Sequence, residues 1–468
     1  MNLNPVLVTG ASGFTGSYVV RELAANGYSV RAMVRSEDQA SKLRQDGIEV
    51  VRADLTDQNS LREAVRGAGS IVHIAALFRR AGLPEEEFRR VNLQGTRMLM
   101  DLAIESGVRR FVHCSTVGVL GDVAEIPADE NTPLNPGDMY QRSKADAEDL
   151  VMSYFKSGKL NGVVIRPAMI YGPGDQRILK LFKMISERSF FYVGSGQALV
   201  HFIDVRDLAR AFRLALEQSH LTANIYIIAG SQSLPLKDAV AKIATILNVA
   251  EPKIHLPVRP VQLLGSLCEL ICTPLRINPP IFRRRVDFFT KNRAFDCSKA
   301  ALELGFKPHS SFDEELIDII NSYIESGLIK AEKLNSYCTF RRELDGRITK
   351  WEEGAQRVYG FEPEQALGNI SHKLLNTKFP RPLEHINSEL TKSRAWTGNL
   401  VHLGRNGERL SVLSQWRVEE GAGSGGLTVV ETNRLREMDA GERPLKAAML
   451  NPAWFTAGSL GHSLEMLA

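Results

Sequence analysis

The chain has 468 residues, 44% of them hydrophobic and 24% charged, which suits a globular protein of roughly two to four domains. Its net charge of +4 is small for this length and points to no particular partner, so we expect no nucleic-acid binding. The five cysteines form no CxxC pair, which fits a reducing, cytoplasmic location, and no cluster of ligands suggests a metal site. We expect no signal peptide and, because no stretch reaches about 18 uninterrupted apolar residues, no integral membrane segment.

The first part of the chain alternates short apolar runs with helical patterns. We expect strands at residues 5–10, 29–35, 48–55, 70–76 and 110–116, with helical stretches between them. This alternation continues to about residue 170 and predicts an α/β fold with a doubly wound parallel sheet.

The sequence TGASGFTG places Gly10, Gly13 and Gly16 directly after the first expected strand and at the start of a helix. The first two glycines let the backbone approach a pyrophosphate, and the helix N-terminus supplies N–H donors. The third glycine allows the helix to pack closely on the strand. We therefore predict that this loop, with Phe14 and Thr15 in it, binds a dinucleotide.

The second expected strand ends in Met33-Val34-Arg35-Ser36, without the acidic residue that binds the ribose 2′-hydroxyl of NAD. Arg35 can instead pair with the 2′-phosphate of NADP. We expect the cofactor to be NADP or NAD, with NADP favoured; the alternative is that Arg35 is only a solvated surface charge.

Tyr140 and Lys144 stand four residues apart, so their side chains share one face of a helix. A lysine ammonium favours the phenolate form of a neighbouring tyrosine. Such a pair can move a proton to or from a substrate hydroxyl while hydride is transferred to or from a nicotinamide, and the lysine can also hold the nicotinamide ribose.

Together these motifs resemble the short-chain dehydrogenase/reductase superfamily, in its extended branch of NAD(P)-dependent epimerases, dehydratases and 3β-hydroxysteroid-dehydrogenase-like enzymes. The resemblance covers about residues 5–328. It implies a Rossmann-type first domain over 1–330, with a small substrate subdomain at about 175–200 and 230–328. Further blocks that carry the resemblance are ADL (53–55), HIAA (73–76), VNLQGT (91–96), HCSTVGVLG (113–121) and RPAMIYGPGD (166–175).

The resemblance implies roles for individual residues. Thr116, five positions before Gly121, should hydrogen-bond the reacting oxygen, with Ser115 as the neighbouring alternative. A homodimer is implied through the helix that carries Tyr140. Beyond the glycine loop, Arg35 and the Tyr140/Lys144 pair, the implied cofactor-binding residues are Asp54, Leu55, Ala75, Ala76, Asn92, Pro167 and Ala168.

The substrate is a small molecule whose class the sequence narrows only in part. Nucleotide-sugar members of the family have an arginine where this chain has Val200-His201, and the wording DFFTKNRAFDCSKA is closer to steroid- and lipid-directed members. Thr116 is followed by Val117 and Gly118, without the acids of a dehydratase. Two reactions remain open, oxidoreduction and epimerisation, on a sugar-nucleotide, sterol-like or lipid substrate. The alternatives are a UDP-sugar 4-epimerase and a non-catalytic NADP(H) redox sensor.

The stretch PVQLLGSLCELICTPL (260–275) predicts an amphipathic helix that packs on its own domain. The alternative is a weak peripheral contact with a membrane surface.

Residues 336–436 resemble a PAS domain, an α+β fold with a small pocket between a sheet and short helices. The segment LDGRITKWEEGAQRVYGFEPEQALG (344–368) carries the resemblance, with departures at Glu352 and Phe361, and strands are expected at 399–405, 408–420 and 426–434. The resemblance implies a regulatory or dimerisation module whose ligand is unknown. A flavin–cysteine photosensor is not expected, because residues 350–400 contain no cysteine. The tail, 437–468, is expected to be weakly structured.

Overall fold

A computed structural model describes residues 3–78, 82–123, 125–247, 249–272, 283–308, 312–329, 337–420 and 427–435. The chain divides into two compact units with the boundary after residue 330. The tail at 437–468 lies outside the described residues. Within the described ranges, no helix is both long and apolar enough to cross a bilayer.

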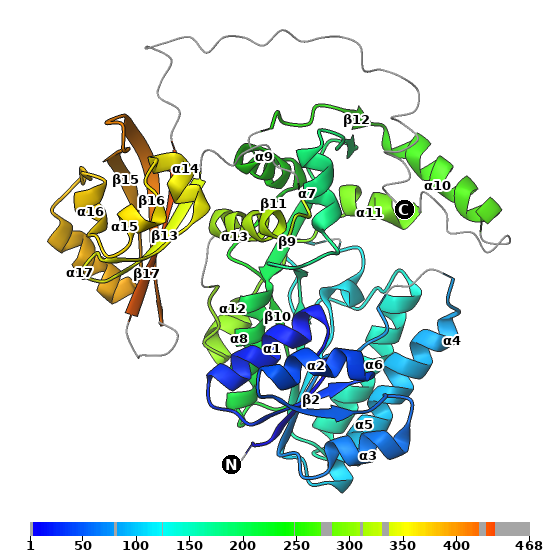
Figure 1. Ribbon diagram of the computed structural model, residues 1–468. Helices are drawn as coiled ribbons and strands as arrows, with labels where there is room; N and C mark the ends of the chain where they lie inside the picture. The colour runs from blue at the N-terminus through cyan, green and yellow to red at the C-terminus, as the bar shows by residue number, and fades with distance from the viewer. Residues whose placement is uncertain are drawn as a thin grey trace. The chain divides into compact units, whose positions relative to one another are not determined.

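A seven-stranded sheet forms the centre of the first unit (Figure 1). Its order is β10-β6-β5-β4-β1-β2-β3, and every neighbouring pair is parallel, which confirms the expected doubly wound sheet. The strand order reverses between β1 and β4, where ligands bind in sheets of this kind. The strands are β1 Val6–Thr9, β2 Val30–Val34, β3 Glu49–Arg52, β4 Ser70–His73, β5 Arg110–Cys114, β6 Gly162–Pro167 and β10 Asn224–Ile228.

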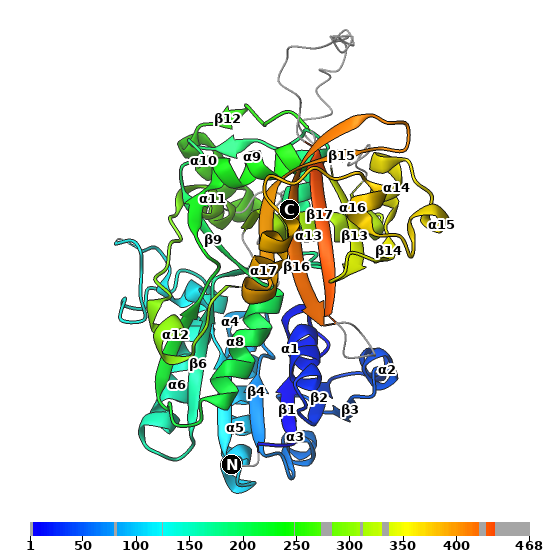
Figure 2. The same ribbon diagram turned by 90° about the vertical axis from the view of Figure 1, so that its left-hand side faces the viewer.

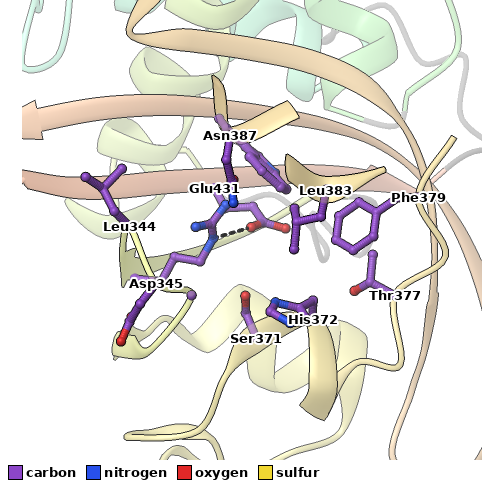
Figure 3. Close-up of a pocket in the computed structure, with 12 residues that line it drawn as sticks. Leu344, Asp345, Ser371, His372, Thr377, Phe379, Leu383, Asn387 and Glu431 are labelled. Carbon is purple, nitrogen blue, oxygen red and sulfur yellow. Dashed lines mark hydrogen bonds and ion pairs between the residues drawn. The ribbon is translucent and has the colours of Figure 1, made fainter. Parts of the chain in front are cut away.

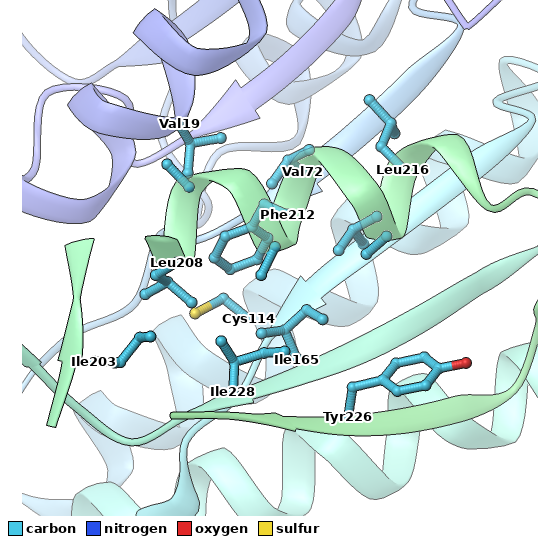
Figure 4. Close-up of a cluster of buried hydrophobic side chains, with 14 of the residues drawn as sticks. Val19, Val72, Cys114, Ile165, Ile203, Leu208, Phe212, Leu216, Tyr226 and Ile228 are labelled. Carbon is cyan, nitrogen blue, oxygen red and sulfur yellow. The ribbon is translucent and has the colours of Figure 1, made fainter. Parts of the chain in front are cut away.

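Helices cover both faces of this sheet, because strand side chains alternate between the two faces and both sets are apolar. One face packs against α1, α2, α8 and α12; Figure 4 shows Leu208 and Phe212 of α8 close to Cys114 of β5, and Figure 2 shows α8 along the sheet. The other face packs against α3, α5 and α6. These helices are α1 Phe14–Ala25, α2 Glu37–Gln45, α3 Gln58–Val65, α5 Gly95–Glu105, α6 Met139–Lys156, α8 Val205–Glu217 and α12 Ser298–Glu303.

Shorter elements complete the first unit beyond the carboxyl ends of the strands. A three-stranded sheet has the order β11-β9-β7, and β12 pairs with β8. The remaining strands are β7 Met169–Tyr171, β8 Tyr192–Val193, β9 Leu199–Asp204, β11 Ser233–Pro235 and β12 His255–Leu256. The remaining helices are α4 Glu85–Phe88, a π-helix at Arg89–Gln94, a 3-10 turn at Val117–Leu120, α7 Leu179–Ser186, α9 Leu236–Ile246, α10 Val258–Cys272, α11 Arg283–Thr290 and α13 Phe312–Glu325.

Helix α10 corresponds to the amphipathic segment of the sequence and packs against α11. Leu263 and Leu264 on this helix are 63% and 52% exposed. The expected helix is therefore present, and part of its apolar surface faces solvent.

The last helix of the first unit, α13, packs against β7. Glu315 of α13 hydrogen-bonds the Tyr171 hydroxyl of β7 inside the protein, and Tyr323 Oη donates to the carbonyl of Asp175 at 2.5 Å. Phe312 stacks on Tyr171 with the ring centroids 6.0 Å apart. Burial, with the nearby Asp204 and Asp207 carboxylates, raises the pKa of Glu315 to about 8.

The second unit is a five-stranded antiparallel sheet in the order β14-β13-β17-β16-β15, and its long strands are visible side by side in Figure 2. Trp351 and Tyr359 are buried in its core. Its elements are β13 Tyr337–Glu343, β14 Ile348–Trp351, α14 Glu353–Tyr359, α15 Pro363–Ala366, α16 Ser371–Leu374, α17 Leu383–Ser393, β15 Ala395–Leu403, β16 Arg409–Glu420 and β17 Leu427–Leu435.

Polar side chains separate the interior of the second unit into two apolar clusters, one around Phe340 and Trp351 and the other around Trp396 and Val412. Between them, Arg342 and Glu431 form a buried ion pair with Nε and Oε2 2.9 Å apart. The Arg342 guanidinium also lies over the Trp416 ring, 4.2 Å from its centroid. A buried layer of this kind is stable only while its charges remain paired.

Candidate active site

A large cleft opens at the carboxyl ends of the parallel strands in the first unit. It has a volume of about 1440 Å³ and extends from the glycine loop to α7 and α11. This is the crevice expected where the strand order reverses beside β1. The predicted site residues that line it are Gly10, Gly13, Phe14, Thr15, Gly16, Arg35, Asp54, Leu55, Ala75, Ala76, Thr116, Tyr140, Pro167 and Ala168.

The glycine loop has the tight geometry that the sequence predicts. Gly10 has a φ of +71°, and a Cβ there would lie 2.9 Å from the backbone nitrogen of Ala75. A Cβ at Gly16 would lie only 2.0 Å from the carbonyl oxygen of Gly10. Helix α1 begins at Phe14, and its N-cap residue Gly13 provides no side-chain hydrogen bond, so backbone N–H groups of the first turn can meet an anion. These features fit the pyrophosphate of a dinucleotide.

A buried hydrogen-bond network holds the strand end opposite this loop. Thr9 Oγ1 accepts from the backbone nitrogens of Ile74 and Ala75, both at 3.1 Å, so its hydrogen points to His73 Nδ1, 2.8 Å away. His73 Nε2 then donates to Thr96 Oγ1 at 2.9 Å. Burial, with the charge of Lys144, lowers the pKa of His73 to about 3, so the ring is neutral. The network fixes the segment that carries Ala75 and Ala76.

Arg35 and Asp54 lie at the end of the cleft formed by β2 and β3. Arg35 is exposed, and Asp54 Oδ1 accepts hydrogen bonds from Thr56 N at 2.8 Å and Thr56 Oγ1 at 2.7 Å. Burial alone would raise the pKa of Asp54, but these bonds and the charges of Arg35 and Arg90 lower it overall. Asp54 is therefore an ionised acceptor beside an exposed guanidinium.

Tyr140 and Thr116 both open onto the cleft. Tyr140 follows the N-terminus of α6, where Asp138 caps the helix by accepting from Gln141 N at 2.8 Å. Its ring packs edge-on against Phe78, with the centroids 5.0 Å apart. Thr116 Oγ1 accepts from Gly118 N at 3.0 Å, which leaves its hydroxyl hydrogen to donate elsewhere. Ser115 Oγ, the neighbouring alternative, is buried without a hydrogen-bond partner among the described residues.

Lys144 lies behind these two residues rather than among those that line the cleft. Its side chain is only 3% exposed, and Nζ donates to the carbonyl oxygen of Cys114 at 2.6 Å. Burial lowers the pKa of the Lys144 ammonium, while Cys114 and Glu148 oppose that shift. The lysine is thus held by the end of β5, two residues before Thr116.

Asn92, which the family resemblance implies among the cofactor-binding residues, has its side chain bonded within the protein. It is buried and does not line the cleft. Its side chain accepts from Leu77 N at 2.7 Å and donates to Leu77 O at 3.1 Å and to Ser143 Oγ at 2.9 Å. Asn92 therefore joins the loop after β4 to the helix that carries Tyr140.

The half of the cleft beyond Tyr140 is mostly apolar, and sequence patterns did not reveal it. Two cations on its rim are already satisfied: Lys291 pairs with Asp287 at 3.2 Å, and Arg293 donates to the Asp287 carbonyl at 3.2 Å. Val200 and His201, at the position of the family's arginine, are buried, and burial lowers the pKa of His201, so that ring is neutral. The apolar wall is formed by Phe78, Leu181, Met184, Phe190, Phe288 and Phe289.

The second unit has a small pocket of about 20 Å³ between its sheet and helices α16 and α17 (Figure 3). The buried Arg342–Glu431 pair lines it, as do His372 and Phe379. This volume is close to that of one water molecule. His372 lines the pocket, whereas His385 is exposed.

The fold and the cleft define the first unit as an NAD(P)-dependent oxidoreductase of the extended short-chain dehydrogenase/reductase type, and comparisons with known proteins agree. Residues 6–229 match the NAD dependent epimerase/dehydratase family. Sterol demethylase protein B of Methylococcus capsulatus is 30% identical over 336 residues, covering 69% of this chain and 99% of that protein. The chain therefore belongs to the NAD dependent epimerase/dehydratase family.

Other relatives are more distant in sequence. A putative dihydroflavonol 4-reductase of Synechocystis is 29% identical, with 69% of this chain and 96% of that protein covered. The crystal structure of gox2253 has 28% sequence identity and a TM-score of 0.60, and covers 69% of this chain and 99% of that one. UDP-glucose 4-epimerase from Thermotoga maritima, at 20% identity and a TM-score of 0.57 over the same shares, has the same fold.

Proposed function

We propose that the first unit catalyses NADP-preferring oxidation or reduction of a secondary alcohol or ketone carried on an apolar molecule. The observation that supports this most is that Tyr140 and Thr116 open onto the same cleft as the glycine loop. A group that moves a proton and a group that binds the dinucleotide thus face one space large enough for both ligands.

In this proposal each residue has a separate task. When bound, the nicotinamide dinucleotide accepts hydride from the alcohol or supplies it to the ketone. Thr116 donates a hydrogen bond to the substrate oxygen, and Tyr140 takes the hydroxyl proton as the alcohol is oxidised or returns it in reduction. Lys144, held at the carbonyl of Cys114, places a positive charge near the phenolate that forms. Arg35 pairs with the 2′-phosphate of NADP.

The apolar wall supports a hydrophobic substrate rather than a nucleotide sugar. At the positions where nucleotide-sugar members of the family have an arginine, Val200 and His201 carry no charge, and Lys291 nearby is paired with Asp287. Relatives named sterol demethylase protein B and 4-hydroxy-2-methyl-3-oxo-4-farnesyl-3,4-dihydroquinoline-1-oxide ketoreductase, at 30% and 29% identity, carry apolar ring or isoprenoid groups in their names.

Epimerisation is a second candidate function. One relative, 28% identical over 304 residues, is named N-acetyl-alpha-D-glucosaminyl-diphospho-ditrans,octacis-undecaprenol 4-epimerase. Its named substrate joins a sugar to a long isoprenoid, so an apolar cleft does not by itself separate the two activities. A non-catalytic redox sensor is disfavoured, because Tyr140 and Thr116 would then have no task in the cleft.

For the second unit we propose a PAS-type module that regulates the first unit or holds a homodimer together. Its antiparallel sheet, the short helices against it and the pocket between them support this assignment. A pocket of about 20 Å³ favours dimerisation or a very small ligand over a bulky cofactor. Activity of residues 1–330 compared with the full chain tests regulation; equal rates would favour a passive dimerisation module.

A substrate panel tests the proposed reaction. Sterols, β-keto lipids, 2-hydroxy lipids and nucleotide sugars would be incubated with the full chain and NADPH or NADP, and absorbance of the reduced nicotinamide would be followed. We expect turnover with an apolar alcohol or ketone and none with UDP-sugars. Turnover restricted to UDP-sugars would contradict the proposal. Epimerisation gives no net cofactor change, so products would also be separated and identified.

A further inference from the structure

A short segment between β7 and α7, residues 172–178, crosses the start of helix α1. Tyr18 Oη of α1 donates to the carbonyl oxygen of Pro173 at 2.8 Å. Six residues after the last residue of β7, Arg177 places its guanidinium carbon 5.1 Å from the centroid of the Phe14 ring. Phe14 is the first residue of α1, and Arg177 also lines the cleft. The segment therefore brings a cation to the glycine loop from a distant part of the sequence.

Asp175 and the carbonyl of Ile170 bind one edge of the Arg177 guanidinium and fix its orientation. Nε donates to Asp175 Oδ1 at 2.9 Å, and Nη2 donates to Asp175 Oδ2 at 3.3 Å and to the Ile170 carbonyl at 3.2 Å. Asp175 is 1% exposed, and its own carbonyl accepts from Tyr323 Oη. Among the residues that the structure describes, none forms a hydrogen bond with Nη1, and the side chain remains 40% exposed on the cleft. The buried carboxylate fixes the arginine while leaving donors on its outer edge.

The glycine loop itself has no cationic side chain. TGASGFTG offers backbone N–H groups and the positive end of the α1 dipole, but no lysine or arginine to meet a doubly charged pyrophosphate. Arg35 and Arg90 flank Asp54 at the other end of the bound cofactor, and Arg90 is paired with Glu87. Of the arginines and lysines in the described cleft, Arg177 is the one shown in contact with a side chain of the loop.

We propose that Arg177 is a cofactor-binding residue whose outer guanidinium edge pairs with the pyrophosphate of the dinucleotide. The two N–H groups of Nη1 can donate to phosphate oxygens, and the Phe14 ring and the Asp175 carboxylate hold the guanidinium in place before the ligand arrives. The role rests on the proposed dinucleotide site and adds to it a contact that the glycine-loop pattern does not contain.

Binding measurements on the full chain test this role. Calorimetric titrations would compare wild type, Arg177→Met and Arg177→Lys with three probes: NADPH, ADP-ribose, which has the pyrophosphate but no nicotinamide, and adenosine 2′-monophosphate, which lacks a pyrophosphate. We expect Arg177→Met to raise the Kd of NADPH and ADP-ribose by roughly 10- to 100-fold, the range for a hydrogen bond to a charged group. Adenosine 2′-monophosphate should bind as to wild type. Arg177→Lys keeps the charge without the guanidinium and should weaken binding less.

Arg21, on the helix α1 that also carries Phe14, provides a matched control. Arg21 lies over the Tyr18 ring of α1, 5.6 Å from its centroid, but does not line the cleft, so Arg21→Met removes a similar cation–ring contact and should leave all three Kd values unchanged. Thermal unfolding followed by circular dichroism identifies any variant that loses its fold. If Arg177→Met does not fold, the Kd values of Arg177→Lys are used for the comparison with wild type.

Two results would overturn the role of Arg177. One is an ADP-ribose Kd within twofold of wild type in folded Arg177→Met. The other is unchanged cofactor binding with a raised KM for the substrate, which would assign Arg177 to the substrate instead. If wild type binds no ADP-ribose and no NADPH, the proposed function fails as well. Binding by wild type with equal binding by Arg177→Met rejects only the role of Arg177.

Discussion

Asn92 and Ser143 are joined inside the first unit by a hydrogen bond of 2.9 Å from Nδ2 to Oγ. Ser143 Oγ in turn donates to the carbonyl of Tyr140 at 2.8 Å, and the Asn92 amide also binds both backbone groups of Leu77. One buried side chain therefore sets the spacing between the start of the Tyr140 helix and the loop that carries Ala75 and Ala76.

Replacing the Asn92 side chain should both destabilise the fold and displace the helix that carries Tyr140. Asn92→Ala leaves Leu77 N and O without their partner in a partly buried position, and we expect the free energy of unfolding to fall by about 1–3 kcal/mol. Urea denaturation followed by circular dichroism measures the loss. Asn131→Ala, at an exposed asparagine, is the control and should change stability by less than about 0.5 kcal/mol. An equal effect of the two substitutions would refute the bridging role.

Tyr140→Phe should remove turnover while leaving the cofactor bound. Loss of an acid–base group lowers kcat by roughly 100-fold or more, whereas the ring and its contact with Phe78 remain. Tyr154→Phe on the same helix is the control, because its hydroxyl bonds Asp101 at the surface, and it should retain full activity. Unchanged turnover in Tyr140→Phe would show that the proton path lies elsewhere.

Arg35→Ser should change the choice of cofactor rather than its binding in general. Without the guanidinium, we expect the Kd of NADPH to rise by roughly 10- to 100-fold, while the Kd of NADH, which has no 2′-phosphate, stays the same. Titration of both cofactors in wild type and variant is the measurement. If wild type already prefers NADH, the assignment of Arg35 to the 2′-phosphate is wrong.

Stability of the first unit should fall as the pH rises towards 8. The pKa of Glu315 is about 8 in the folded protein, above the value of about 4.3 for an unfolded chain. The folded state therefore binds the extra proton between these values. The contribution is fully present below pH 4 and is lost as the pH passes 8, at no more than about 1.4 kcal/mol per pH unit.

Glu315→Gln keeps a neutral side chain of the same shape at every pH and should flatten this dependence. Urea titrations from pH 5 to 9, followed by circular dichroism, compare it with wild type. Glu325→Gln, at an exposed position on the same helix, should behave as wild type. Parallel curves for wild type and Glu315→Gln would mean that Glu315 titrates normally.

Removing one partner of the buried Arg342–Glu431 pair should lower the free energy of unfolding more than removing both partners. Arg342→Met leaves Glu431 charged and unpaired, and we expect a loss of about 3–5 kcal/mol, whereas the double variant with Glu431→Met should lose less. All four tryptophans lie beyond residue 330, so tryptophan fluorescence reports on this part of the chain alone. A double variant less stable than Arg342→Met would contradict the account.

Local motifs predicted much of the first unit because their geometry is set within a few residues. The glycine loop and the Tyr140 helix are such cases, and so is the alternation that produces the parallel sheet. The expected strand at 48–55 was too long: β3 ends at Arg52, because the Asp54 carboxylate binds Thr56 N and turns the chain.

Contacts between distant residues were not predictable in this way. Arg177 meets Phe14 across more than 160 positions of sequence, and no spacing rule connects them. The apolar wall of the cleft likewise combines side chains from separate elements, such as Phe78 and Phe289, whose meeting depends on how those elements pack. Asn92 was assigned to the cofactor from the motif around it, whereas its contacts with Leu77 and Ser143 depend on how three elements pack.

The position of α13 has a consequence for how the protein is made. Tyr171 and the Asp175 carbonyl find their partners in Glu315 and Tyr323, which follow 144 and 148 residues later. A nascent chain leaves the ribosome from its N-terminus, so the seven sheet strands emerge long before α13 can pack against β7. The first unit becomes complete only when residue 325 has been released. Premature termination before that point would give a chain that has every catalytic motif but lacks the helix that bonds Tyr171 and the Asp175 carbonyl.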